Sequence, residues 1–175
     1  MNIRELQRED IEEIWKIDRG EVIENIYHLQ NGNLVLHPEY YDMQGWPPGE
    51  AEQYLPILLD CFDRGGTFYG AFQNGALIGV VVLDNKFIGP NRDQLQLKFL
   101  HISRPYRKQG LGKTLFNKAV ERAQKMKARK LYISATPSEN TINFYINKGC
   151  AVTQELDREL FELEPEDIHL EYVIP

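Results

Sequence analysis

The sequence has few cysteines, no long apolar run and no excess of positive charge, and each absence excludes a class of protein. Its only two cysteines, Cys61 and Cys150, stand far apart and in no metal-ligand spacing, so two free thiols in or near the core are expected. No apolar stretch has the length needed to cross a bilayer, so no membrane association is expected. The formal net charge of −6 argues against a nucleic-acid surface. The same acidity mildly favours a cationic substrate, although many proteins are acidic for solubility alone.

Two further signals are missing. The first residues, 1–5, lack a charged-then-apolar targeting pattern, so the expected location is cytoplasmic. The four histidines are scattered without zinc-type pairing, so no metal site is expected. With 175 residues, the chain is expected to form a single domain over 1–175.

Hydrophobic periodicity predicts the order strand, two helices, three strands, helix, strand, helix and two strands. This order is typical of an α+β domain around a central, mostly antiparallel sheet. The expected strands are 1–5, 67–73, 76–84, 94–102, 131–135, 151–155 and 169–174, with an acidic loop between the last two. The expected helices are a helical pattern from 7 that continues through 22–27, a helix over 50–64, one from Gly110 and one over 139–148. Asn74-Gly75 predicts a two-residue hairpin turn, and Asn31-Gly32 is a further turn signal.

The segment Arg107-Lys108-Gln109-Gly110-Leu111-Gly112 lies where a strand ending at Ile102 leads into a helix. Backbone N–H groups at a helix N-terminus can bind a phosphate, and the glycines let a ligand approach the backbone. Arg107, Lys108 and Lys113 add positive charge beside that position. The segment therefore predicts an anion site.

A nucleotide-binding P-loop is the alternative for this segment, because Gly112-Lys113-Thr114 resembles the end of that motif. The motif requires a further glycine where Arg107 stands. The strand 131–135 also ends without an aspartate that could serve magnesium. Both departures disfavour a nucleoside triphosphatase.

The residues from Leu100 to Leu115 resemble the acetyl-CoA-binding motif of the GNAT superfamily of N-acetyltransferases. Those from Pro137 to Cys150 resemble its second motif, with Cys150 in place of the usual phenylalanine. The resemblance is specific from about Gln94 to Cys150 and weak before Thr67. It implies a GNAT-like sheet of about seven strands flanked by helices, with two splayed parallel strands that hold CoA.

The resemblance also implies which residues bind acetyl-CoA. Backbone groups of Leu100 and Ile102 would pair with the pantetheine arm, and the N–H groups from Gln109 to Thr114 would hold the pyrophosphate. Ser138 stands where the family most often has asparagine. The implied cofactor-binding residues are Leu100, Ile102, Arg107, Lys108, Gln109, Gly110, Leu111, Gly112, Lys113, Thr114, Ser138, Asn140 and Asn143.

Tyr145 matches the family's usual proton donor to the leaving thiolate; its alternative is a helix tyrosine with a structural hydrogen bond. The general base is missing, since Gln96 and Lys98 stand where many relatives have a glutamate or histidine. A water chain, or a carboxylate such as Glu24, Glu39 or Asp42, could take its place. His101 is expected to be a packing residue.

Residues 33–49 are rich in proline and aromatic residues and show no sustained period. A long irregular connection in a small domain is often a binding loop, so this one is the expected acceptor element. The candidate acceptor residues are Glu24, Glu39, Tyr40, Tyr41, Asp42 and Trp46. Packing of the loop on the domain explains the same residues equally well.

The resemblance therefore implies an N-acetyltransferase that moves an acetyl group from acetyl-CoA to a primary amine of a small molecule or peptide by direct attack. The alternative is a non-catalytic acyl-CoA-binding sensor or partner module, suggested by the missing base. Edge strands near the C-terminus could pair in a homodimer.

Overall fold

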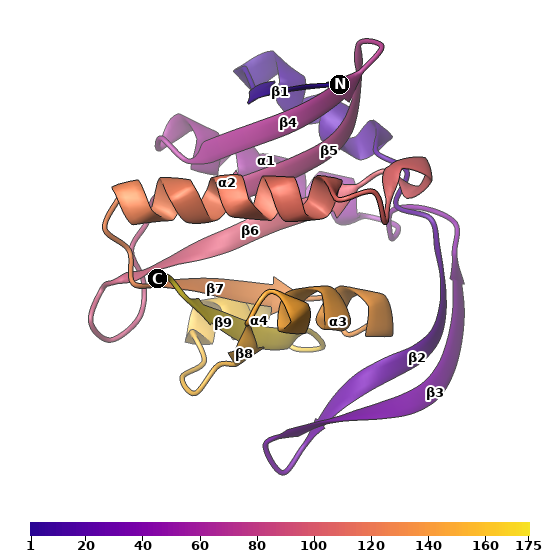
Figure 1. Cartoon of the computed structure of the whole chain (residues 1–175), viewed down its shortest axis with the longest axis vertical. Helices are drawn as coiled ribbons and strands as arrows, with labels where there is room; N and C mark the ends of the chain where they lie inside the picture. Colours follow the sequence, from indigo (N-terminus) through magenta and orange to yellow (C-terminus); the bar gives the residue numbers. More distant parts are fainter.

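The computed structural model describes all residues from Met1 to Pro175 and builds them around a seven-stranded sheet (Figure 1). The strands are β1 (Asn2–Glu5), β2 (Glu21–Gln30), β3 (Asn33–Met43), β4 (Thr67–Gln73), β5 (Ala76–Leu83), β6 (Gln94–Ile102), β7 (Lys130–Ala135), β8 (Ala151–Val152) and β9 (Ile168–Val173). The α-helices are α1 (Glu50–Asp63), α2 (Leu111–Lys125), α3 (Glu139–Asn147) and α4 (Arg158–Leu163), and the 3₁₀ helices are η1 (Arg8–Lys16) and η2 (Arg104–Tyr106).

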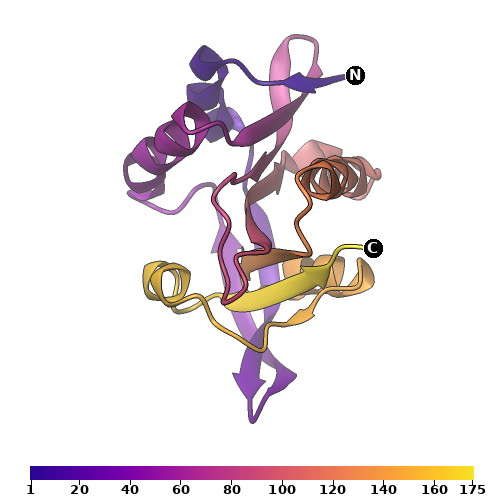
Figure 2. The ribbon, with the colours of Figure 1, turned by 90° about the vertical axis from the view of Figure 1, so that its left-hand side faces the viewer.

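The sheet order is β1-β4-β5-β6-β7-β9-β8, and only the β6–β7 pair is parallel. Figure 2 shows α1 and α4 on one face of the sheet and α2 and α3 on the other. This arrangement confirms the expected α+β class and the mostly antiparallel sheet flanked by helices.

The two faces differ in chemistry. The larger core lies under α2 and α3, where α2 buries a stripe that includes Leu115, Phe116 and Ala119. A second core under η1 and α1 extends across the sheet as far as Phe99. Beyond Phe99, the same face turns polar; its inward side chains there are Gln94, Gln96, Tyr132, Ser134 and His169. The sheet is therefore apolar on the α2–α3 side throughout but polar beneath α4.

The two parallel strands separate part-way along their length. Pairing between β6 and β7 runs from Gln94–Lys130 to Leu97–Ile133 and then stops. At that point the register with β5 also shifts, since Val82 pairs with Phe99 while Leu83 pairs with Leu97. Lys98 is thus the extra residue of a β-bulge, which bends β6 away from β7. The remainder of β6, up to Ile102, borders a gap in the sheet.

The segment between η1 and α1 departs most from expectation. Residues 22–27 do not continue a helix: they belong to β2, and the predicted irregular loop over 33–49 begins with β3 as far as Met43. The two strands form a separate hairpin arm around the Asn31-Gly32 turn, whose residues have φ of 52° and 79° (Figure 1). Asn74-Gly75 makes the same type of turn, as predicted.

Two smaller differences lie near the ends of the chain. The helical pattern from residue 7 forms a 3₁₀ helix, η1, and the acidic loop before the last strand contains α4. Asp157 precedes α4 and caps it, since its carboxylate accepts from the N–H of Leu160 at 3.0 Å. No helix of the structure has the length and apolarity to span a membrane.

Candidate active site

The N-terminus of α2 presents a run of free backbone donors. None of the N–H groups from Lys108 to Lys113 donates to another atom of the protein. The N–H of Thr114 already donates to the Gly110 carbonyl at 3.1 Å, as does its hydroxyl, so Thr114 falls outside this run. Unpaired donors at a helix N-terminus, where the helix dipole is positive, fit the pyrophosphate of a coenzyme.

The backbone of this turn explains its glycines. Gly110 has φ of 87°, and no atom lies within 4 Å of the position that a Cβ would take. Lys108 is held at φ of 61°, which is uncommon for a residue with a side chain. Gly112 faces Phe144 of α3, whose ring atom Cε2 would lie 3.3 Å from an added Cβ. The turn is therefore open on the outside, while α2 and α3 approach each other closely at Gly112.

The edge of β6 that borders the gap can accept an extended ligand. Ser103 N–H donates to Ile78 of β5 at 2.8 Å, and the direction of backbone groups alternates along a strand. The backbone groups of Leu100 and Ile102 therefore face the gap. The Ile102 carbonyl accepts from the Arg107 side chain, whereas Leu100 has no partner on that side.

The Arg107 side chain is hydrogen-bonded to backbone carbonyls of the protein and is not free to contact an anion. Its guanidinium donates to the carbonyls of Ile102 at 2.8 Å, Gly20 at 2.8 Å and Asp18 at 2.9 Å. Burial lowers the pKa of Arg107. The side chain fastens the start of β2 to the end of β6, so the free charges beside the anion site are those of Lys108 and Lys113.

Polar residues of α3 and of the segment before it lie against the β2–β3 hairpin arm. Asn143 accepts from the Tyr27 hydroxyl at 2.7 Å, and Asn140 donates to Glu21 at 3.3 Å. Ser138 is buried, and its hydroxyl donates to Thr141 at 3.0 Å. The side chains of Asn140 and Asn143 are thus hydrogen-bonded to residues of β2.

Tyr145 of α3 lies in the core beside Phe116 and Phe144. Its hydroxyl makes no hydrogen bond, and the one fully buried side-chain polar atom without a partner is Nε1 of Trp15. The Tyr145 hydroxyl therefore reaches accessible space. Burial raises the pKa of Tyr145 well above its ordinary value, so the group stays protonated and can donate.

On the opposite face, beneath α1 and α4, aromatic side chains border the gap. The ring of Trp46 lies 4.9 Å from that of His101 and stacks on Phe99, and its Nε1 donates to Ile17 at 3.0 Å. Burial, with the cations Arg19 and Arg107, lowers the pKa of His101 to about 3. His101 is therefore a neutral packing residue, as expected, and too weak a base to take a proton from an amine.

Arg19 contacts three separate segments on this face. It forms an ion pair with Glu50 at the start of α1, and its Nη2 lies 3.4 Å from the Thr136 hydroxyl just after β7. Its guanidinium also lies over the Trp46 ring, 5.1 Å from the ring centre.

Three carboxyl groups meet on this face. Glu164 follows α4 and accepts from the Tyr54 hydroxyl of α1, and Asp167 accepts from Ser134 of β7 at 3.2 Å. Glu50 is the third. Burial raises the pKa of all three, to about 7 for Glu164, where Asp167 and Glu50 add to the effect. The face beneath α1 and α4 therefore brings together three carboxyl groups and one guanidinium.

Of the six acceptor residues expected from the sequence, Trp46 alone has side-chain contacts with this face. Glu39 lies against His28 on the arm at 3.2 Å. Glu24, Tyr40, Tyr41 and Asp42 are exposed, and their side chains make no hydrogen bond, ion pair or aromatic contact. Sequence reasoning missed Arg19, Glu50, Glu164 and Asp167, because no local pattern marks them.

The positions where relatives of the family carry a base hold no free carboxylate. Gln96 is buried where β6 still pairs with β7. The Lys98 ammonium lies 3.2 Å from Asp84, which Arg64 also contacts at 2.9 Å. Although burial alone would raise it, these cations lower the pKa of Asp84 to about 2. Asp84 is a structural counter-ion.

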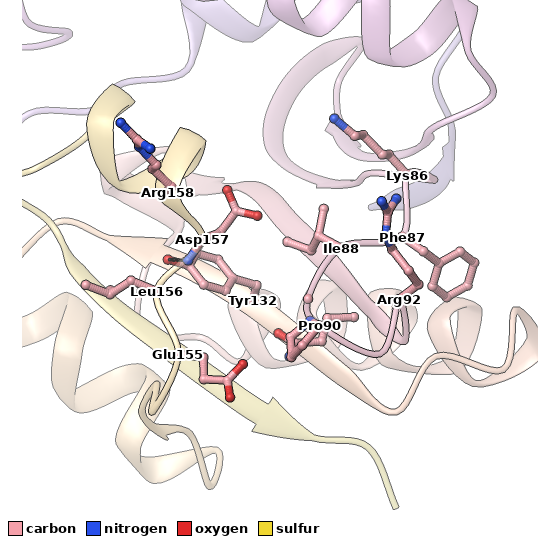
Figure 3. A pocket seen from close by; sticks show the side chains of 12 residues that line it. Lys86, Phe87, Ile88, Pro90, Arg92, Tyr132, Glu155, Leu156, Asp157 and Arg158 are labelled. Atoms are coloured by element: carbon pink, nitrogen blue, oxygen red, sulfur yellow. Dashed lines mark hydrogen bonds between the residues drawn. The ribbon is translucent and has the colours of Figure 1, made fainter.

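A separate pocket lies between the β5–β6 connection and the start of α4, with Tyr132 beside it (Figure 3). Its charged lining residues are of both signs, with Lys86, Arg92 and Arg158 cationic and Glu155 and Asp157 anionic, so it presents no concentrated charge of one sign (Figure 3). The gap between β6 and β7 is therefore the better candidate for chemistry.

The comparisons with known proteins agree with this geometry. The model of the acetyltransferase (GNAT) family matches residues 20–150, and the chain belongs to that family. It is accordingly an acetyl-CoA-dependent acyltransferase, and acetyl-CoA is its co-substrate. No curated protein matches the sequence significantly.

Solved structures share the fold across nearly the whole chain. A nourseothricin acetyltransferase is 17% identical, with 99% of this chain and 98% of that chain covered and a TM-score of 0.72. PaiA N-acetyltransferase from Thermoplasma acidophilum, solved with coenzyme A, is 21% identical, with 98% of each chain covered and a TM-score of 0.64. N-acetylglutamate synthase from Neisseria gonorrhoeae is 17% identical, with 99% of this chain but 35% of that chain covered and a TM-score of 0.63. The names of these proteins cover different acceptors, so the shared fold leaves the acceptor open.

Proposed function

We propose that the protein transfers the acetyl group of acetyl-CoA to a primary amine of a cationic small molecule, by direct attack of the amine on the thioester. The supporting observation is the set of carboxyl groups on the acceptor side, Glu50, Glu164 and Asp167, which face one guanidinium, that of Arg19. A carboxylate-lined site attracts cations and disfavours anions. The acidic chain, with its net charge of −6, supports the same choice.

The residues on the coenzyme side have separate roles. The N–H groups from Lys108 to Lys113 and the charges of Lys108 and Lys113 hold the pyrophosphate. The free edge at Leu100 aligns the pantetheine arm. Tyr145 protonates the departing sulfur, which converts a poor leaving group into a neutral thiol.

Acceptor class is tested by measuring CoA release with spermidine, nourseothricin and glutamate at equal concentration. We expect turnover with a cationic amine and a kcat/KM for spermidine at least about tenfold above that for glutamate, a ratio that shrinks at high salt. Glutamate as the best of the three would contradict it. Tight acetyl-CoA binding without turnover on any amine would point to the non-catalytic sensor.

The role of Tyr145 is tested by Tyr145→Phe, which removes only the hydroxyl and leaves the ring in the core. Loss of a general acid is expected to lower kcat by about 10²-fold or more. Acetyl-CoA affinity, measured by calorimetry, should stay unchanged because the anion site is untouched. Unaltered turnover in this variant would leave Tyr145 with a packing role.

A further inference from the structure

Glu164 lies between α4 and α1, the two helices that cover the proposed acceptor face of the sheet. It directly follows α4, and its side chain extends to α1, where it accepts from the Tyr54 hydroxyl. Tyr54 itself is buried and packs on Phe99, the β6 residue directly after the bulge. This chain of contacts places the Glu164 carboxyl on the acceptor side of the segment of β6 that borders the gap.

A buried hydrogen-bond relay fixes the backbone that carries Glu164. The His169 Nε2 lies 2.9 Å from the Glu164 carbonyl, and its Nδ1 lies 2.7 Å from the Tyr132 hydroxyl. Tyr132 in turn accepts from the N–H of Asp157, the residue before α4, at 3.3 Å. Both ends of α4 are therefore anchored to β7 and β9, so Glu164 is held on a rigid support.

We propose that Glu164 accepts the proton of the substrate ammonium and so acts as the general base of the acetyl transfer. The inference rests on the proposed function, because it assumes an amine acceptor in this gap. Glu164 would supply the base that Gln96 and Lys98 cannot supply. It lies in the C-terminal segment, whereas the carboxylates considered from the sequence were Glu24, Glu39 and Asp42.

The protons and electrons of the step balance among the protein, its two substrates and solvent. Glu164 takes one proton from the ammonium, and the freed lone pair forms the C–N bond to the thioester carbonyl carbon. The C–S bond breaks with its electron pair on sulfur, and Tyr145 supplies the proton that makes the thiol. The second proton lost by nitrogen passes through solvent and restores the Tyr145 hydroxyl. Glu164 then releases its proton to solvent, so each turnover of an ammonium substrate liberates one proton.

The charged groups around Glu164 suit this role. Asp167 precedes β9 and Glu50 begins α1, and both carboxyl groups favour protonation of Glu164, while Arg19 opposes it. Burial contributes most, and together these effects raise the pKa of Glu164 to about 7. His169 lies against the Glu164 backbone and Tyr54 donates to its carboxyl. A base with this pKa is ionised in a large fraction of molecules near neutrality and still binds a proton well.

The test compares wild type with Glu164→Gln, using spermidine and acetyl-CoA and following kcat/KM across pH. The wild-type profile should contain an ascending limb centred near pH 7. In Glu164→Gln this limb should be absent, and kcat/KM at pH 7.5 should fall by about 10²-fold or more. Glu166→Gln changes an exposed carboxylate two residues away and serves as the matched control, with the limb and the rate retained.

A second readout does not depend on the acceptor. A base beside the thioester also activates water, so slow acetyl-CoA hydrolysis without amine should fall in Glu164→Gln and stay unchanged in Glu166→Gln. If spermidine is not acetylated but hydrolysis depends on Glu164, the acceptor class is wrong and the base assignment stands. If Glu164→Gln keeps the acetylation rate and the limb near pH 7, or hydrolyses acetyl-CoA as fast as wild type, Glu164 is not the base.

Discussion

At the scale of single residues, burial and partners decide the role of a side chain more than its type does. Asp84 and Glu164 are both carboxyl groups close to the sheet, yet cations lower the pKa of Asp84 to about 2 while burial raises that of Glu164 to about 7. The first is fixed as a counter-ion, and the second can exchange a proton near neutrality. The environment therefore gives Asp84 a structural role and leaves Glu164 able to take part in proton transfer.

Arg107 gives a prediction at this scale. Arg107→Ala removes three hydrogen bonds from a guanidinium to backbone carbonyls and loosens β2 from the end of β6. We expect a loss of about 2–4 kcal/mol in the free energy of unfolding, or roughly 5–15 °C in Tm by calorimetry. Lys113→Ala is the control, since Lys113 is exposed and unbonded: it should keep Tm and weaken acetyl-CoA binding a few-fold at low salt. A normal Tm for Arg107→Ala would mean that the guanidinium does not hold this junction.

At the scale of elements, the hairpin arm is the part that sequence reasoning placed wrongly. The segment 21–30 contains valine, isoleucine and tyrosine, which favour strands, and it ends at Asn31-Gly32, a strong hairpin signal. The apolar spacing of Val22, Ile23, Ile26 and Tyr27 nevertheless matches a helix. These residues do not form one buried face: Ile23 and Ile26 are buried, Val22 is exposed, and Ile26 forms a bridge with Ser138 before α3.

Shortening the arm tests how far it contributes to the domain. His28 pairs with Val35 in the same way as Gln30 pairs with Asn33 at the present turn, so the residues between them, 29–34, can be replaced by Asn-Gly without a change of register. The contacts of the arm with α3 and the segment before it come from Glu21, Asn25, Ile26 and Tyr27, which this variant retains. We expect Tm to change by less than about 4 °C and acetyl-CoA affinity to stay the same. A large fall in either would show that the outer arm is part of the folded core or of the coenzyme site.

At the scale of the whole molecule, the carboxyl groups with raised pKa values make the free energy of unfolding depend on pH. Glu164 titrates near 4.5 when unfolded and about 7 when folded, so the folded state binds its proton more tightly. Its favourable contribution is complete at low pH and is lost as pH rises through that window. Asp84 acts in the opposite sense: its contribution is present above its ordinary value of 3.8 and is lost as pH falls towards 2.

The free energy of unfolding, measured by urea titration, should therefore be greatest in mildly acidic solution and decline by about 1–2 kcal/mol between pH 5 and pH 8, after allowance for solvent screening at Glu164. Glu164→Gln should flatten this decline, because the variant has no charge to bury. A curve that rises steadily towards pH 8 in the wild type would contradict the raised pKa.

The sequence by itself determined the coenzyme side of the protein. The strand to Ile102, the turn at Gly110 and the helix after it are contiguous, so the free N–H groups follow from local conformation and can be predicted from a motif. Tyr145 lies in a second contiguous motif. The family, the sheet of about seven strands and the co-substrate followed from these two segments.

Only the tertiary structure decided the proposed acceptor side. Arg19, Glu50, Ser134 and Glu164 come from four distant parts of the chain, and no spacing along the sequence relates them. The β-bulge at Lys98 opens the gap, and packing of α1 and α4 on one face brings the carboxyl groups together there. Their raised pKa values arise from that burial, which is a property of the folded sheet and not of any local segment.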